Sequence, residues 1–278
     1  METFLVLTAA GLAAGFVAGL VGVGGGIIFA PVLLFYFRSL GVAEPALTPL
    51  TLGTSLLCTL FTTSVSSFHH HRRGVVVWRI AGVSGIGSVV GVVAIATLVT
   101  TQPWYDQGAF RLVFSLLLVV VAIRMIVERE RSENADRMTR TDVKMSSAGL
   151  AMVGTAAGTV SAAAGVGGGV VLVPAFNRLV KLPIHSAIGT SSATIILIAT
   201  IGVTTYAIEG IGLDIRSLSL GYVDPLTALG LSVPALFTTR AGVITAHRIR
   251  QRPLRIGFAV FALIVAAKLT SDALLASW

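Results

Sequence analysis

Ten apolar segments separated by short polar connections fill most of this chain. Several are about 20 residues long, the length that an α-helix needs to cross the hydrocarbon core of a bilayer. Two are shorter, at 11 residues, and each follows a run of glycines. The pattern predicts an all-α integral membrane protein. The segments are Phe4–Val21, Ile27–Phe37, Pro49–Phe68, Val75–Val99, Phe110–Val127, Ser146–Ala164, Val170–Val180, Ala187–Ile208, Val223–Ala246 and Leu254–Leu275.

Composition and charge agree with this class. Hydrophobic residues make up 55% of the 278 residues and charged residues only 12%, whereas soluble domains carry about 25% charged residues. The formal net charge of +8 comes from basic residues at the ends of apolar segments. We therefore interpret them as topology signals and expect no binding of nucleic acid. The single cysteine, Cys58, lies inside an apolar segment, and we interpret it as a packing residue.

The sequence repeats itself in order. The pentapeptide Gly22–Gly26 recurs as Gly165–Gly169, and the tripeptide Gly53–Ser55 recurs as Gly189–Ser191. Ordered matches through both halves indicate an internal duplication. We divide the chain into a first transmembrane repeat (1–127), a polar linker (128–145) and a second transmembrane repeat (146–278).

Charge changes sides between equivalent loops of the two repeats. His69–Arg79 carries three arginines, whereas its counterpart carries Glu209 and Asp214. Thr100–Gln107 has no Lys or Arg, whereas its counterpart, His247–Arg255, carries four arginines. Because basic loops lie in the cytoplasm, equivalent loops are expected on opposite sides of the membrane. This is typical of inverted-topology repeats.

The predicted fold is therefore two inverted-topology repeats, each a re-entrant or broken helical hairpin plus three spanning helices. An 11-residue segment makes about 16 Å of helix, about half of a bilayer core. This is why we place the glycine runs at the turns of hairpins. The expected location is the cell membrane, as a multi-pass protein, with the central loop 128–145 cytoplasmic and both termini outside.

The two glycine runs suggest the chemistry of the protein. Three consecutive glycines should break a helix, and irregular backbone at membrane depth must face protein or water. The half-helix after each break presents unpaired N–H groups and the positive end of its dipole, which favour an anion. The alternative is close helix packing through small residues, which we favour for Gly11, Gly15, Gly154 and Gly158.

Hydroxyl side chains follow on the next predicted helix of each repeat. They could replace the hydration shell of an anion, or they could bond to the carbonyl four residues earlier, and both interpretations stay open. Arg240 is the one cation well inside a predicted segment; it could attract anions or snorkel to the cytoplasmic interface. The predicted substrate-binding residues are Gly24, Gly25, Gly26, Gly167, Gly168, Gly169, Thr54, Ser55, Thr190 and Ser191, with Arg240 as a further candidate.

A run of three histidines, His69 to His71, raises the question of a metal site. Helical metal sites favour ligands four residues apart with a carboxylate nearby, whereas consecutive histidines point in different directions and have no acid beside them. We favour a membrane-interface cluster and predict no metal ligands.

The pattern GxGGG-x4-P, present as Gly22–Pro31 and Gly165–Pro174 and followed in each half by Gly-Thr-Ser, resembles the TauE/SafE sulfite exporter family. The resemblance covers nearly the whole chain. It implies a membrane permease for small anions, chiefly sulfite, sulfonates and sulfoacetate-like compounds.

The sequence thus predicts a secondary transporter that exports a small sulfur-containing anion across the cytoplasmic membrane. An anion channel, or a permease for another small anion, is the alternative. We expect no enzyme activity, no catalytic residues and no cofactor, because no nucleophile with a base and no Walker motif occurs in the sequence. The expected partners are the small anionic substrate and the lipid bilayer, and a homodimer is left open.

Overall fold

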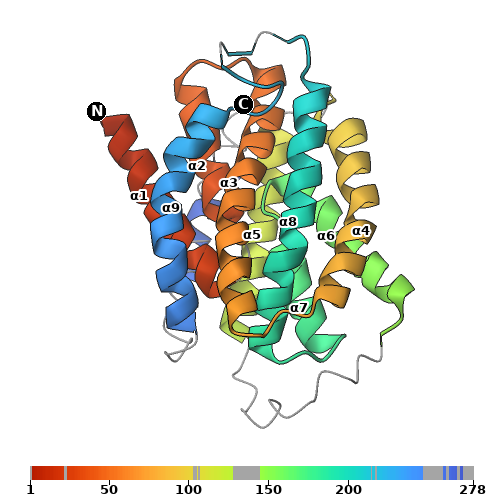
Figure 1. The fold of residues 1–278 in the computed structure, drawn as a ribbon. Coiled ribbons are helices and arrows are strands. Elements are labelled where there is room, and N and C mark those ends of the chain that lie inside the picture. Colours follow the sequence, from red (N-terminus) through yellow and green to blue (C-terminus); the bar gives the residue numbers. More distant parts are fainter. Residues whose placement is uncertain are drawn as a thin grey trace.

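The computed structural model describes residues 2–21, 24–102, 105, 107–127, 145–213, 215–216, 218–246, 259–260, 263–267 and 270–271. Within these ranges the chain forms a bundle of helices (Figure 1). An isolated bridge between Leu220 and Val223 is the only β-type pairing among the described residues. The helices are α1 (Glu2–Val21), α2 (Gly26–Ser39), α3 (Glu44–Arg72), α4 (Trp78–Ile95), the π-helix η1 (Ala96–Thr100), α5 (Gln107–Val127), α6 (Ser147–Ala164), α7 (Gly169–Arg178), α8 (Ile184–Glu209) and α9 (Pro225–Ala246).

The prediction of an all-helical membrane protein is confirmed. Each of the first nine predicted apolar segments contains a helix, whereas most of the tenth, Leu254–Leu275, lies outside the described residues. Among the described residues, five helices are long and apolar enough to cross a membrane. They are α3, α4 with η1, α6, α8 and α9.

Helices α3 and α8 form the centre of the bundle. Their most apolar stretches are 78% and 67% buried, against 33% for α4. They run in opposite directions along each other. Gly53, near the start of α3, packs on Tyr206, near the end of α8, and Gly189, near the start of α8, packs on His70, near the end of α3.

Small residues set the two closest helix crossings. A Cβ on Gly15 of α1 would lie 2.0 Å from the carbonyl oxygen of Ala235 on α9. A Cβ on Gly154 of α6 would lie 1.8 Å from the carbonyl oxygen of Ser84 on α4. Only glycine lets the backbones come so close. The first helix of each repeat therefore packs on the fourth helix of the other, and Gly15 and Gly154 are packing residues.

The hairpins of the two repeats enter the bundle from opposite ends (Figure 1). Helix α1 starts and α2 finishes at the upper end of Figure 1, whereas α6 starts and α7 finishes at the lower end. The α3–α4 and α7–α8 connections, which carry Arg73 and Lys181, share the lower end; the α2–α3 and α8–α9 connections share the upper end. This arrangement is what inverted repeats would produce, but the relation of either end to the cytoplasm stays a prediction.

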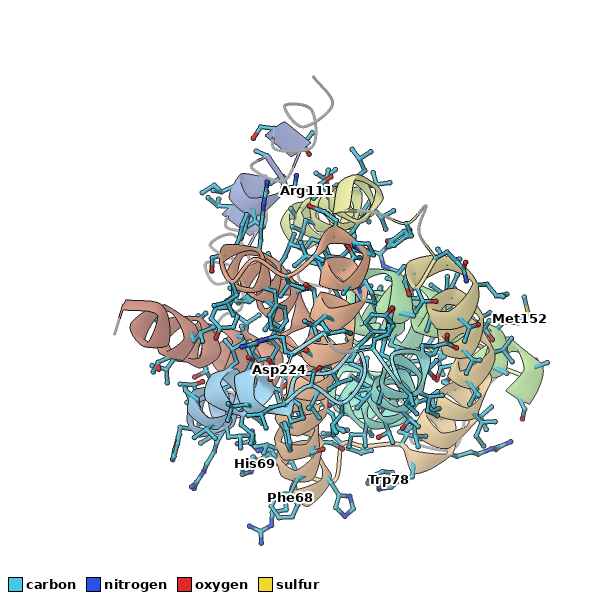
Figure 2. All side chains as sticks on the ribbon, turned by 90° about the horizontal axis from the view of Figure 1, so that it is seen from above. Phe68, His69, Trp78, Arg111, Met152 and Asp224 are labelled. Atoms are coloured by element: carbon cyan, nitrogen blue, oxygen red, sulfur yellow. The ribbon has the colours of Figure 1, made fainter. Side chains whose placement is uncertain are left out.

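The rim of the bundle carries large apolar side chains. Phe68, Trp78 and Met152 point away from the helices when the molecule is viewed from above (Figure 2). They are 53%, 54% and 74% exposed. Because water would disfavour so much apolar surface, this rim is the surface that faces lipid.

We predict that single cysteines in equivalent loops react with impermeant thiol reagents from opposite sides of the membrane. Arg73 and Ile211 are both exposed and follow α3 and α8, so Arg73→Cys should be modified only from inside and Ile211→Cys only from outside. The native Cys58 is fully buried, and a Cys58→Ala background serves as the unlabelled control. Labelling of both sites from one side would show that the repeats are not inverted.

Candidate functional site

The two glycine turns have the same backbone conformation. The φ angles are +88° and +75° at Gly24 and Gly25, and +79° and +78° at Gly167 and Gly168. This left-handed region disfavours residues with a Cβ, which explains why glycine occupies these positions. Gly25 and Gly168 are the N-cap residues of α2 and α7. Both half-helices therefore begin directly at a turn.

The turns of the two repeats meet in the interior. A Cβ on Gly26 would lie 2.5 Å from the carbonyl oxygen of Gly165 and 2.6 Å from the Cα of Val166. Gly26 and Val166 are both buried. The two glycine runs are far apart in the sequence, and the structure brings them into contact.

Hydroxyl groups from α3 satisfy carbonyl oxygens of both turns. Ser55 donates a hydrogen bond of 2.8 Å to the Gly165 carbonyl oxygen, and Thr62 donates one of 2.9 Å to the Gly24 carbonyl oxygen. An unsatisfied backbone group in a bilayer core costs several kcal/mol. These two bonds therefore allow the chain to leave the helical conformation at this depth.

Tyrosine hydroxyls bond in the same way to carbonyl oxygens at the end of α6. Tyr206 donates to the Ala162 carbonyl oxygen and Tyr105 to the Ala163 carbonyl oxygen, each at 2.9 Å. Tyr206 also bonds to Thr100 of η1 at 2.6 Å. Burial raises the pKa of Tyr105 well above its usual range, so the hydroxyl keeps its proton and remains a donor.

The starts of α2 and α7 supply positive potential at this meeting point. The N–H groups of Ile28 and Phe29 bond to the Gly25 carbonyl oxygen, and those of Val171 and Leu172 bond to the Gly168 carbonyl oxygen. The N–H groups of the very first residues of a helix have no partner within the helix. Two helix N-termini in a buried place favour an anion over a cation.

Thr54 and Thr190, which we predicted as substrate-binding residues, each accept a hydrogen bond from the opposite repeat. The Thr54 hydroxyl accepts a hydrogen bond of 3.0 Å from the N–H of Asp224, just before α9. The Thr190 hydroxyl accepts one of 3.0 Å from the N–H of Val77, just before α4. Each hydroxyl thus holds the start of a helix in the other repeat. Ser191 is buried as well.

Thr59 is a residue to which the sequence gave little weight. Its side chain is fully buried, and its hydroxyl has no hydrogen-bond partner in the described part of the chain. A Cβ on Gly24 would lie 2.7 Å from the Thr59 methyl carbon, so Thr59 borders the first turn. Its position one turn after Ser55 was the only signal in the sequence.

Two arginines of the helices differ in their exposure. Arg240, the further candidate, is exposed on the surface of α9, which fits the snorkelling alternative. Arg111 of α5, which belongs to the predicted apolar segment Phe110–Val127, is only 2% exposed. Burial depends on which helices pack around a position, so it cannot be predicted from the charge of a residue or from its place in the sequence.

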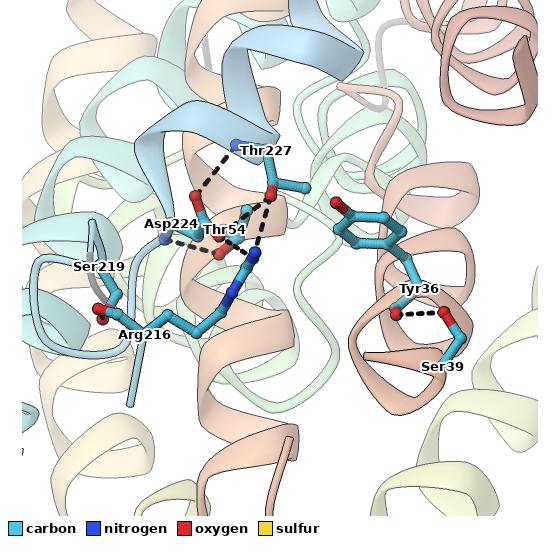
Figure 3. Close-up of polar contacts among 7 residues, drawn as sticks. All are labelled: Tyr36, Ser39, Thr54, Arg216, Ser219, Asp224 and Thr227. Carbon is cyan, nitrogen blue, oxygen red and sulfur yellow. Dashed lines mark hydrogen bonds and ion pairs between the residues drawn. The ribbon is translucent and has the colours of Figure 1, made fainter. Parts of the chain in front are cut away.

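An acidic residue is also buried, although every acid falls near the end of an apolar segment. Asp224 is 3% exposed and pairs with Arg216 of the α8–α9 connection (Figure 3). The Asp224 carboxylate accepts hydrogen bonds of 3.0 Å from both the N–H and the hydroxyl of Thr227. Through these bonds Asp224 caps the N-terminus of α9. The Arg216 guanidinium lies 5.7 Å from the centre of the Phe37 ring at the end of α2.

The histidine cluster lies at the end of α3, and the described residues contain no group of three or more His, Cys, Asp or Glu side chains that could hold a metal ion. The Trp78 indole donates a hydrogen bond of 3.2 Å to Nδ1 of His71. The Arg72 guanidinium lies 4.8 Å from the centre of the Phe68 ring. Exposed aromatic rings beside basic groups suit a membrane–water interface.

We predict that Thr54→Val lowers stability without changing anion affinity. The change leaves the buried N–H of Asp224 without its acceptor, which should cost about 1–3 kcal/mol. Thermal unfolding in detergent and anion binding to the same sample measure the two effects. Thr190→Val is the matched variant in the other repeat and should behave alike. Unchanged stability together with lost binding would contradict this prediction and favour Thr54 as a substrate-binding residue.

Comparison with known proteins gives one consistent result. A profile of the family described as "Sulfite exporter TauE/SafE" matches residues 7–269. A "Probable membrane transporter protein" of Haemophilus influenzae is 29% identical over 268 residues, covering 96% of this chain and 98% of its own. The "Probable membrane transporter protein MJ0441" of Methanocaldococcus jannaschii is 27% identical over 257 residues, covering 91% of each chain. No solved structure matches.

Proposed function

Because this multi-pass membrane transporter belongs to the TauE/SafE sulfite exporter family, we propose that it is a secondary transporter that exports a small sulfur-containing anion. Sulfite, a sulfonate or sulfoacetate would cross the cytoplasmic membrane through the point where the two glycine turns meet. The observation that carries the proposal is the contact of Gly26, at the start of α2, with Gly165 and Val166 of the turn that precedes α7 in the protein interior.

Two features of this meeting point support an anion as the substrate. The first residues of α2 and α7 offer backbone N–H groups, and an anion could approach them once the protein atoms packed against Gly26 move apart. Broken helices that meet near the middle of the membrane are a common design of substrate sites in secondary transporters. The predicted site residues Gly24 to Gly26 and Gly167 to Gly169 are the ones that would contact the anion.

The packing of the turns supports a carrier over a channel. Gly26 is in direct contact with the opposite turn, and the surrounding side chains of α3 and α8 are buried. An open channel would need a continuous aqueous path at this depth. A carrier instead needs the turns to separate toward one side at a time.

The substrate panel is the first test. The purified protein in proteoliposomes should move at least one of sulfite, sulfoacetate and taurine faster than empty liposomes do, with saturable rates. Sulfate, a divalent anion with four equivalent oxygens, is the comparison anion. Absence of flux for every anion, in protein that elutes as a single species and unfolds cooperatively, would contradict the proposed function.

We predict further that the membrane potential drives export without proton coupling. One negative charge that leaves a cell with a negative interior gains about 2.3 kcal/mol per 100 mV, equivalent to about a 50-fold gradient. Flux should therefore follow an imposed potential and ignore a pH gradient at zero potential, provided that the charge state of the substrate is fixed.

The matched variant for this test is Asp224→Asn. It removes a carboxylate that is only 3% exposed and keeps an oxygen that can cap α9. Loss of a pH-driven component in this variant would show that Asp224 couples transport to protons.

A further inference from the structure

The α8–α9 connection lies across the upper end of the bundle (Figure 1). Tyr222 and Val223, its last residues before Asp224, are buried. The N–H of Tyr222 donates a hydrogen bond of 3.1 Å to the Tyr206 carbonyl oxygen on α8, and a Cβ on Gly53 of α3 would lie 2.2 Å from the Tyr222 carbonyl oxygen. The connection is therefore packed on both central helices and covers this end of them.

The ion pair of Arg216 with Asp224 fixes the connection to the start of α9 (Figure 3). The Arg216 guanidinium also lies 3.4 Å from the Thr227 hydroxyl and faces the Phe37 ring at the end of α2. Asp224 is buried, whereas the Arg216 side chain is 31% exposed. One arginine thus joins three parts of the upper end, which are the connection, α9 and α2.

The two ends of the bundle differ at this position. Thr54 and Thr190 are equivalent hydroxyls of the two repeats, and they accept hydrogen bonds from the N–H groups of Asp224 and Val77. Val77 therefore occupies, at the lower end, the place that Asp224 occupies at the upper end, and its side chain carries no charge. An ion pair at this position can form only at the upper end, which the charge pattern predicts to face outside.

One face of α3 leads from the ion pair to the first glycine turn. Positions 54, 58 and 62 share this face because they are four residues apart. Thr54 accepts the hydrogen bond from Asp224, and the Cys58 thiol lies 3.7 Å from a carbonyl oxygen of α9. Thr62 donates to the Gly24 carbonyl oxygen. The contact of α3 with α9 therefore extends from the upper end toward the turn.

Two buried hydroxyls near this contact have no hydrogen-bond partner in the described part of the chain. They belong to Thr59, which borders Gly24, and to Ser232 of α9. Positions 224, 228 and 232 share one face of α9, and Ala228 supplies the carbonyl oxygen that Cys58 contacts. A buried hydroxyl without a partner costs free energy, so an anion that passes between the two helices would find donors along its way.

We propose that the Arg216–Asp224 pair is the latch of an outer gate, and that the substrate leaves along the contact of α3 with α9 below it. While the latch is intact, the α8–α9 connection covers this route. The pair separates when the upper end opens, and the departing anion is an alternative partner for the guanidinium. This inference rests on the proposed function and adds the gate and the exit route.

The native Cys58 reports on the opening of the route, because it is fully buried between the latch and Gly24. An impermeant thiol reagent, applied from the side on which Ile211→Cys reacts, should label Cys58 slowly in the wild type. Arg216→Gln leaves the buried carboxylate without its cation and should raise the labelling rate about tenfold, less than for a fully buried pair because Arg216 is partly exposed. Arg216→Lys keeps the charge and should label at nearly the wild-type rate.

Arg38→Gln is the matched control, since it removes an exposed arginine from the end of α2 at the same end of the bundle. It should leave the labelling rate unchanged. Asp224→Asn should raise the rate as Arg216→Gln does, and the double variant should add little, because both changes break one interaction. An unchanged rate in both single variants, or an equal rise with reagent applied from the opposite side, would overturn the latch.

The exit route is tested by flux through the labelled protein. Modification of Cys58 in Arg216→Gln should block anion flux in proteoliposomes, whereas the same reagent should not change the flux of Cys58→Ala. Undiminished flux after complete modification would overturn the route. Labelling needs no transported substrate, so a wild-type protein that shows the expected labelling pattern but moves no anion would contradict the proposed function and leave the latch standing.

Discussion

Unsatisfied backbone groups inside a bilayer are the constraint on which this architecture depends. The chain breaks its helices twice at membrane depth, and each break exposes carbonyl oxygens that lipid cannot bond. Ser55 and Thr62 of α3, with Tyr206 of α8, bond to these oxygens. The central helices are therefore rich in buried hydroxyls because they serve the turns, and their own packing must accommodate that polarity.

The two repeats also pack closely against each other. Helix α1 packs on α9 through Gly15, and α6 packs on α4 through Gly154. Thr54 and Thr190 bond across the same boundary to the residues that precede α9 and α4. This packing brings the start of α2 against the turn that precedes α7.

Much of the fold could be predicted from the sequence because lipid permits few backbone structures. Apolar runs had to become helices, and three glycines in a row had to interrupt them. The glycine positions of the candidate site followed from the same reasoning. The roles of individual hydroxyls did not follow, since Thr54 and Thr59 look alike in sequence and differ only in whether a distant N–H reaches them. The burial of Arg111 and Asp224 could not be predicted either, because it depends on neighbours that are far away in the chain.

The crossing of α1 with α9 has a consequence for biogenesis. Helix α1 leaves the ribosome before α9, and the chain between the end of α1 and the start of α9 must be synthesised before α9 can cover the row of glycines on α1. Until the second repeat is inserted, the glycine face of α1 lacks the helix that covers it in the finished bundle.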